Sequence, residues 1–292
     1  MKNNWELRNV GVVVRDLDKA LEYYQSLGIS TLEPGEEKLR IHNDELVFGT
    51  LVPFKTRAKR VRVGNVWIEL IQPVEGNGIH MEFLNKYGGG IQHIDFYVDD
   101  LEKETAILVK RGIKVMLIRE SKSPFTYFDT RGVGNITIEL AQRREVAKVA
   151  ESDWKFRHLG VVVKDMGKTL EYFQSMGIGD FEPGIPETET RTELVYGKPV
   201  TFKIKLGKVM RIGNADIELV QPVEGKSLHQ EFLDTQGEGM HHISFAVDFE
   251  KERAKLVGKG VPIVLSREND NSFSYFDMRK FGDTLIELNQ RR

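Results

Sequence analysis

The sequence predicts an α+β protein built from two tandem copies of one domain, because the chain repeats itself almost from end to end. Four segments recur, and each is followed here by its copy: 8–16 and 157–165, 68–76 and 217–225, 90–96 and 239–245, 138–140 and 286–288. The offset is 149 residues between Asn9 and His158 and between His93 and His242. It is 148 residues between Glu139 and Glu287. Such a constant spacing indicates duplication.

Each half divides again into two units of the pattern βαβββ. The β-branched run at 10–14 precedes apolar residues at helical spacing over 17–27, and Gly28 ends that predicted helix. The same strand and helix follow His93, where Asp99 and Asp100 open the helix and Gly112 closes it. Further strands are predicted in the second half at 200–206, 209–212, 215–220, 261–266, 273–276 and 284–288. We therefore predict domains at 1–142 and 156–292, each a U-shaped mixed sheet around a cavity, and a partly helical linker at 143–155.

Composition limits the classes of function. The chain has 292 residues and a net charge of −2, so nothing favours a nucleic-acid partner. It has no cysteine, so a metal ion would be held by nitrogen and oxygen. The first residues lack the apolar core of a signal peptide, and no apolar stretch is long enough for a membrane. We expect a cytoplasmic protein, monomeric or homodimeric, that binds a small molecule and neither nucleic acid nor a membrane.

Four polar positions of the repeat have the residue types of a metal site. In the second half they are His158, Glu218, His242 and Glu287; in the first half they are Asn9, Glu69, His93 and Glu139. A carboxylate in an apolar strand such as Ile-Glu-Leu-Val needs a cation or a raised pKa if it is buried. Two imidazoles and two carboxylates suit a divalent ion and leave positions for substrate oxygens. The second half is predicted to bind the metal, and binding by the first half stays open.

Other residues are expected to be structural. Strand alternation places His241 on the face opposite His242. His80 and His229 are interpreted as surface or hinge residues, and Tyr127 and Tyr275 as core residues. The cationic side chains of Lys203, Lys205 and Arg211 are expected at solvated strand edges, with a CoA phosphate as the alternative partner.

The repeated phrases resemble the vicinal oxygen chelate superfamily, which includes glyoxalase I, methylmalonyl-CoA epimerase and the extradiol dioxygenases. The resemblance rests on His-Leu-Gly-Val-Val-Val at 158–163, Ile-Glu-Leu-Val-Gln-Pro at 217–222 and Gly-Glu-Gly-Met-His-His-Ile at 237–243. It covers nearly the whole chain, once per half, and implies two glyoxalase-like domains. The four-residue ligand set is similar to glyoxalase I, whereas the surrounding sequence is more similar to the epimerase. Gly207 and Ala58 stand where the epimerase has a second catalytic glutamate.

Three functions follow from the resemblance. The first is a metal-dependent isomerase, epimerase or lyase that moves a proton next to a carbonyl or thioester, with Glu218 and Glu287 as candidates for ligand and catalytic base. Its substrate would be an acyl-CoA or a 2-oxo compound, its ion Co²⁺, Mn²⁺, Ni²⁺, Zn²⁺ or Fe²⁺, and it would consume no oxygen.

The second function is an extradiol-type Fe²⁺ dioxygenase with a triad of His158, His242 and Glu287. It is placed second because the segment 269–274 lacks a histidine and because Glu218 would crowd the oxygen site. The third is a small-molecule binding or resistance protein without turnover.

Overall fold

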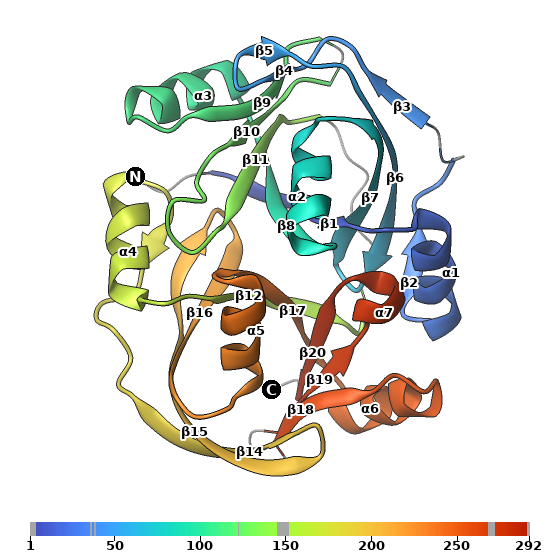
Figure 1. The fold of residues 1–292 in the computed structure, drawn as a ribbon, viewed down its shortest axis with the longest axis vertical. Helices are drawn as coiled ribbons and strands as arrows, with labels where there is room; N and C mark the ends of the chain where they lie inside the picture. Colours follow the sequence, from blue (N-terminus) through green and yellow to red (C-terminus); the bar gives the residue numbers. More distant parts are fainter. Residues whose placement is uncertain are drawn as a thin grey trace.

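Two mixed β-sheets, one in each half, form the protein (Figure 1). The computed structural model describes residues 4–35, 37, 39–121, 123–144, 152–267 and 272–290. The strands between residues 6 and 142 all pair within the first sheet, and those between residues 155 and 290 pair within the second. This confirms the predicted α+β fold, with halves whose strands do not interleave. The helical character predicted for the linker falls mainly on residues 145–151, which lie outside the described residues.

The first half contains eleven strands in one sheet. The strands are β1 (Glu6–Val13), β2 (Ser30–Leu32), β3 (Leu39–His42), β4 (Leu46–Val47), β5 (Thr50–Leu51), β6 (Phe54–Val63), β7 (Val66–Gly76), β8 (Gly90–Val98), β9 (Val115–Arg119), β10 (Phe125–Phe128) and β11 (Thr137–Gln142). The helices are α1 (Leu17–Leu27), α2 (Ile79–Tyr87) and α3 (Leu101–Lys110). The order β2-β6-β7-β1-β8-β11-β10-β9-β4-β5 puts the two strand-helix units side by side, and β3 pairs with β6.

The second half repeats this arrangement with nine strands. They are β12 (Lys155–Val162), β13 (Asp180–Phe181), β14 (Glu189–Val195), β15 (Lys198–Ile212), β16 (Ala215–Glu224), β17 (Gly239–Val247), β18 (Ile263–Arg267), β19 (Phe273–Asp277) and β20 (Leu285–Gln290). Its helices are α4 (Met166–Ser175), α5 (Leu228–Gln236), α6 (Phe249–Gly258) and α7 (Arg279–Gly282). Here β14 pairs with β18 and β15 with β16, so the sheet closes on itself around its interior.

The first helix of each half forms for the reasons visible in the sequence. The side chain of Asp16 accepts a hydrogen bond from the backbone N–H of Lys19, and Asp165 does the same for Lys168. Gly28 ends α1 with a φ of 66°, a conformation that costs other residues more than glycine. The predicted break between 206 and 209 is wrong, because β15 passes through that region with a bulge in its pairing to β16.

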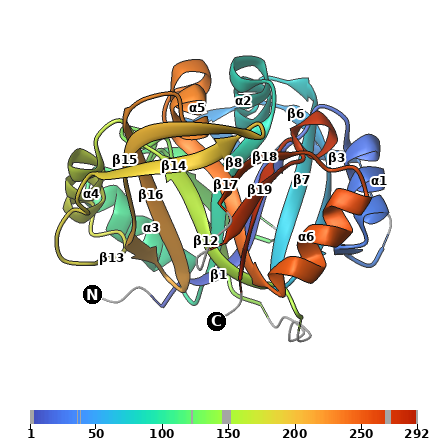
Figure 2. The ribbon, with the colours of Figure 1, turned by 90° about the horizontal axis from the view of Figure 1, so that it is seen from below.

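The two halves share one hydrophobic core. Buried side chains of both central strand pairs, among them Val12 and Val161, belong to the same cluster. The backbone N–H of Leu7 donates to Asn214 Oδ1 at 2.6 Å, and that of Phe156 donates to Asn65 Oδ1 at 2.5 Å. Figure 2 shows α1 beside α6 on one flank and α3 near α4 on the other. The halves therefore meet through equivalent, repeated contacts, as two copies of one domain would.

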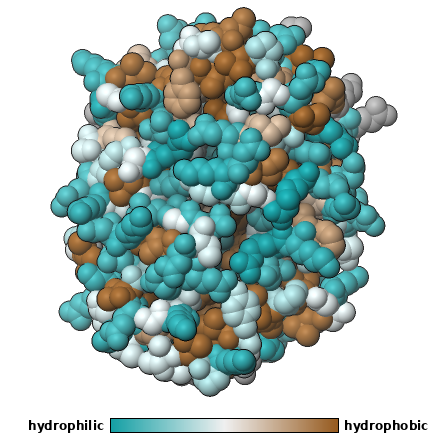
Figure 3. Space-filling view, viewed as in Figure 1, coloured by the Kyte–Doolittle hydropathy of each residue, from teal (hydrophilic) through white to brown (hydrophobic). Residues whose placement is uncertain are grey.

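Among the described residues, no helix is long and apolar enough to cross a membrane. Figure 3 shows a largely hydrophilic face with scattered apolar atoms, some of them at the top over β4 and β5, where Leu46, Phe48 and Leu51 are exposed.

Candidate metal centre

The strand pairing of the second half places the four predicted ligands in two adjacent rows on one face of the sheet. In the first row Gly160 lies between Glu218 of β16 and His242 of β17. In the next row Ser244 lies between His158 of β12 and Glu287 of β20. Alternate residues of a strand share a face, so His158 and Gly160 turn the same way, as do His242 and Ser244. The pairing of these strands and the alternation along each strand therefore bring the four side chains together.

The four side chains converge around the Nε2 atom of His158. That atom is 3.2 Å from Glu218 Oε2, 3.1 Å from Glu287 Oε2 and 3.3 Å from His242 Nε2. His242 Nε2 is in turn 3.5 Å from Glu287 Oε2. His158, His242 and Glu287 form a compact group whose ligand atoms all lie within 4.8 Å of one another, and all three are buried. Glu218 approaches this group from the side of His158.

The chemistry of this group fits a divalent ion. Glu287 Oε2 is buried and has no hydrogen-bond partner among the described residues, although two imidazole nitrogens lie within 3.5 Å. Burial disfavours a charged imidazole, but Glu218 and Glu287 outweigh it and raise the pKa of His158 to about 9. The site thus gathers negative charge that attracts a cation. Two imidazoles and one carboxylate form the set that binds Fe²⁺ and related ions and leaves positions open.

The corresponding place in the first half is arranged differently. Asn9 stands at the position of His158, and Asp95 stands at the position of Ser244. Asp95 lies between Asn9 of β1 and Glu139 of β11. The Asn9 amide donates to Asp95 Oδ2 at 2.8 Å, and Arg8 Nη1 lies 2.7 Å from the same oxygen. Arg8 also lies 3.5 Å from Glu139 Oε1. A guanidinium therefore already compensates these carboxylates.

A second arginine compensates the remaining carboxylate of the first half. Arg40 Nη1 is 3.0 Å from Glu69 Oε1. Burial opposes ionisation of Glu69, but Arg40 and Arg8 lower its pKa to about 2. Glu69, His93 and Glu139 still form a compact buried group. Because both arginines compete with a metal ion for these oxygens, we expect weaker binding here than in the second half.

A glycine gives each central histidine its space. A Cβ atom on Gly160 would lie 1.9 Å from Cε1 of His242, and one on Gly11 would lie 1.9 Å from Cε1 of His93. Both distances are far shorter than real contacts, so any larger residue would displace the ring. The glycine in Leu-Gly-Val-Val-Val is thus required by the close approach of the neighbouring imidazole.

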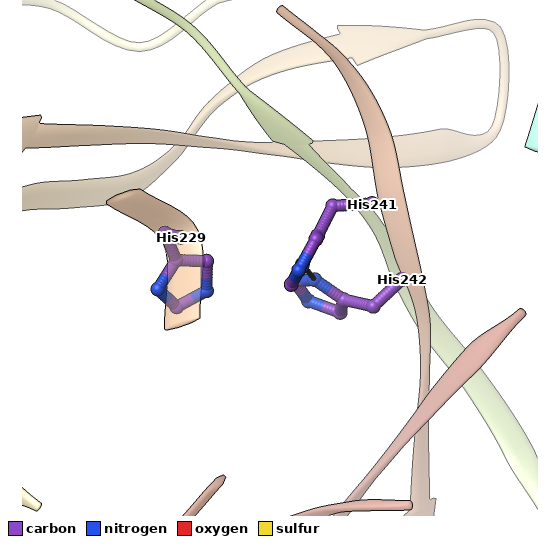
Figure 4. A group of neighbouring side chains, drawn as sticks. All are labelled: His229, His241 and His242. Carbon is purple, nitrogen blue, oxygen red and sulfur yellow. Dashed lines mark hydrogen bonds between the residues drawn. The ribbon is translucent and has the colours of Figure 1, made fainter. Parts of the chain in front are cut away.

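His241 is closer to the candidate centre than strand alternation predicted. Its Nδ1 atom lies 3.1 Å from Nδ1 of His242, so the predicted opposite orientation is wrong. The pairing of β12 with β17 passes from Gly160–His242 to Val161–Met240, and this bulge at His241 breaks the alternation. Figure 4 shows the rings of His241 and His242 together on β17 and that of His229 on α5. His241 is therefore placed to hold the ring of His242 by a hydrogen bond between their Nδ1 atoms.

Several other interpretations also change with the structure. His80 and His229 are buried rather than at the surface, and burial lowers the pKa of His229 to about 3. Tyr275 is buried, as predicted for a core residue, but it also lines the cavity, and its hydroxyl lies 3.2 Å from His242 Nε2. Lys203 and Arg211 pair with Glu224 and Asp216 on the neighbouring strand β16, and both cationic side chains are solvated as expected. The predicted strand edge is wrong, because β15 is paired with strands on both sides at these residues.

A cavity of about 270 Å³ is lined by three of the four predicted ligands, His158, Glu218 and Glu287, whereas His242 is buried behind it. The described part of the cavity wall includes Arg157, Arg191 and Arg267, which the sequence alone did not single out. Arg267 pairs with the buried carboxylate of Glu193. The only sequence signal for Arg157 was its position beside His158. Nothing in the sequence placed Arg191 or Arg267 at this cavity, because β14 and β18 lie far from the ligands in the chain.

Comparison with known proteins agrees with this architecture. The model of the Glyoxalase/Bleomycin resistance protein/Dioxygenase superfamily matches residues 8–131 and 157–275. A mutant of 4-hydroxymandelate synthase from Streptomyces coelicolor has a similar structure, with a TM-score of 0.68, 14% identity and coverage of 100% of this chain and 94% of that chain. BphC, a halotolerant catechol dioxygenase, gives a TM-score of 0.50 at 13% identity, covering 98% of this chain and 86% of that chain.

A methylmalonyl-CoA epimerase from Mycobacterium tuberculosis matches with a TM-score of 0.38 and 25% identity, over 48% of this chain and 88% of that chain. A search of the curated proteins found no match.

Proposed function

The chain belongs to the Glyoxalase/Bleomycin resistance protein/Dioxygenase superfamily, and from this premise we propose that it is an Fe²⁺-dependent dioxygenase with its active site in the second half. The observation that carries the proposal is the compact buried group of His158, His242 and Glu287 beneath a cavity. A two-histidine, one-carboxylate set holds one face of the ion and leaves the other for substrate and oxygen. When bound, Fe²⁺ supplies the one-electron chemistry that lets organic substrates react with oxygen.

The residues around the triad have separate tasks in this proposal. Burial raises the pKa of Tyr275 well above its usual value, so its hydroxyl keeps its proton at the cavity wall and donates a hydrogen bond to a substrate oxygen. Burial opposes ionisation of Glu218, but His158 lowers its pKa. Glu218 is therefore a charged carboxylate beside the triad, placed to accept a proton from the substrate.

The full-length architecture also supports oxygen chemistry. Two of the similar structures that extend over nearly the whole chain are a mutant 4-hydroxymandelate synthase and a catechol dioxygenase, so the tandem arrangement fits that branch of the superfamily. The sequence placed this function second because Glu218 would crowd the oxygen site. In the structure the compact group of possible ligands consists of His158, His242 and Glu287, and Glu218 contacts it at His158 without belonging to it.

The second candidate is the metal-dependent isomerase, epimerase or lyase, and one observation favours it. Glu218 is close enough to His158 to become a fourth ligand or the base that removes a proton next to a carbonyl. In that case Co²⁺, Mn²⁺, Ni²⁺ or Zn²⁺ would serve, and the substrate would be an acyl-CoA or a 2-oxo compound. Cytoplasmic location and a monomeric or homodimeric state stay predictions under both functions.

One experiment separates the two candidates. The protein is reconstituted with Fe²⁺ or with Co²⁺, and a panel of catechols and 2-oxo acids is screened for oxygen uptake and for exchange of substrate hydrogen with deuterium from the solvent. The proposal expects oxygen uptake that needs both Fe²⁺ and His242. Solvent exchange with Co²⁺ and no oxygen uptake with any compound would overturn the dioxygenase and establish the isomerase.

A further inference from the structure

We propose that Arg157 binds a second carboxylate of the substrate, one that is not part of the group that contacts the metal ion, so that the second half acts on an acid that carries an anionic group beside the metal centre. The inference rests on the proposed metal centre but not on whether the reaction uses oxygen. Arg157 lines the cavity together with His158, Glu218 and Glu287. No described residue forms a hydrogen bond or ion pair with it.

In the first half, the arginine equivalent to Arg157 pairs with a carboxylate of the protein itself. Arg157 is the copy of Arg8, whose Nη1 lies 2.7 Å from Asp95 Oδ2. In the second half Ser244 replaces Asp95, and its hydroxyl accepts a hydrogen bond from Asn289 Nδ2 at 2.9 Å. The internal carboxylate has therefore been removed in the half that has the complete ligand set. A substrate carboxylate would occupy the corresponding place.

The local backbone explains why Arg157 reaches the cavity. The pairing of β12 with β17 passes from Phe156–Phe245 to His158–Ser244 and omits Arg157, which is a β-bulge. A bulge disturbs the alternation of side chains, so two consecutive residues can face the same side. Arg157 and His158 both line the cavity as a result. An acid bound to the metal would meet the guanidinium without any movement of the strand.

The charges of the cavity agree with an anionic ligand. The described residues that line it include three arginines, Arg157, Arg191 and Arg267, and three glutamates, Glu193, Glu218 and Glu287. These charges balance, so a bound divalent ion leaves an excess of positive charge. Arg267 and Arg191 face Glu193, and Arg191 also pairs with Glu189 at 2.7 Å. Among the described residues of the cavity wall, Arg157 is the cation without a carboxylate partner, and its planar fork matches a carboxylate.

The test uses the full-length protein loaded with Co²⁺ and a set of 2-oxo acids as probes. Calorimetry compares 2-oxoglutarate and 2-oxoadipate, which have a second carboxylate, with 2-oxopentanoate and 2-oxohexanoate, which end in a methyl group. The wild type should bind the diacids roughly 10- to 150-fold more tightly, since a hydrogen bond to a charged group contributes about 1.5–3 kcal/mol. Arg157→Gln should remove that preference while the Co²⁺ content and the affinity for 2-oxopentanoate stay unchanged.

A second variant tests the same inference while Arg157 is kept. Ser244→Asp returns the carboxylate that the first half has, and it should remove the preference for diacids by pairing with Arg157. Arg211→Gln, which alters an exposed arginine that pairs with Asp216 outside this cavity, should keep the preference. If the wild type binds Co²⁺ but shows no preference, the inference is overturned and the metal centre stands. If no Co²⁺ binds, the proposed function fails and the inference with it.

Discussion

At the scale of single residues, two substitutions and the different pairing of one arginine separate a compensated carboxylate cluster from a candidate metal centre. The first half has Asn9, Asp95 and an Arg8 that pairs with Asp95, where the second has His158, Ser244 and an Arg157 that pairs with no described residue. Burying carboxylates without a cation is costly, so each half needs positive charge. In the first half the chain supplies it as arginine. In the second half we propose that a metal ion supplies it.

Glu218 allows a prediction at this scale, because its role as ligand or base decides the chemistry. Glu218→Gln keeps the size of the side chain and removes its charge. We expect the protein to retain its metal while turnover falls by roughly 10²- to 10⁴-fold, as for loss of a general base. Metal analysis and kinetics on the same sample measure both quantities. The matched change in the first half, Glu69→Gln, should leave turnover nearly intact.

Loss of metal from Glu218→Gln equal to that from Glu287→Gln would contradict this assignment. Glu218 would then be a fourth ligand, and the isomerase would gain support.

At the scale of elements, the register between paired strands positions most side chains of the candidate metal centre. The sequence predicted which strands hold the ligands, and the regular ladder between β17 and β20 places His242 and Ser244 two positions apart, on the same face. It did not predict the bulges at Arg157 and His241, because a bulge depends on how two strands pair and not on either strand alone. It also missed the cavity wall from β14 and β18, since those contacts join segments distant in the chain. The helices α2 and α5, in the segments that bridge the units of each half, were not predicted either.

A pair of matched glycine variants tests the register. Gly160→Ala would place a Cβ atom 1.9 Å from the His242 ring, so the ring must move and metal affinity should fall by roughly 10- to 100-fold. Gly11→Ala creates the same conflict with His93 and should cost about 1–3 kcal/mol of stability with little change in metal content. Thermal denaturation and metal titration distinguish these effects. Equal losses of metal in both variants would show that the register does not set the difference between the halves.

At the scale of the whole molecule, the chain resembles a dimer of a smaller domain, in which one copy keeps the candidate site and both contribute to the shared core. The contact between the halves includes Tyr24 Oη, 3.0 Å from Thr284 Oγ1, and Arg15 Nη2, 2.6 Å from Asp283 Oδ1. The sequence predicted the duplication from its constant offset. It did not predict this contact, which needs the positions of both halves.

Asp283 gives this contact a pH dependence. Burial raises the pKa of Asp283 to about 6 although Arg15 opposes the shift, whereas its ordinary value is 3.8. Between these values the folded protein keeps a proton that the unfolded chain has released. The contribution of Asp283 to stability is therefore fully present below about pH 4 and is lost as the pH rises through about 6. The melting temperature of the wild type relative to Asp283→Asn should fall between pH 4 and pH 7. A difference that does not change with pH would refute this prediction.

The central claim is that the second half alone holds a tightly bound metal ion, and the most direct test is the metal content of three purified proteins after dialysis. Elemental analysis should find about one divalent ion per chain in the wild type and in His93→Ala, and almost none in His242→Ala. Circular dichroism confirms that each variant is folded. Two ions per chain in the wild type, or equal losses in the two variants, would contradict the claim and show that the first half is a metal site as well.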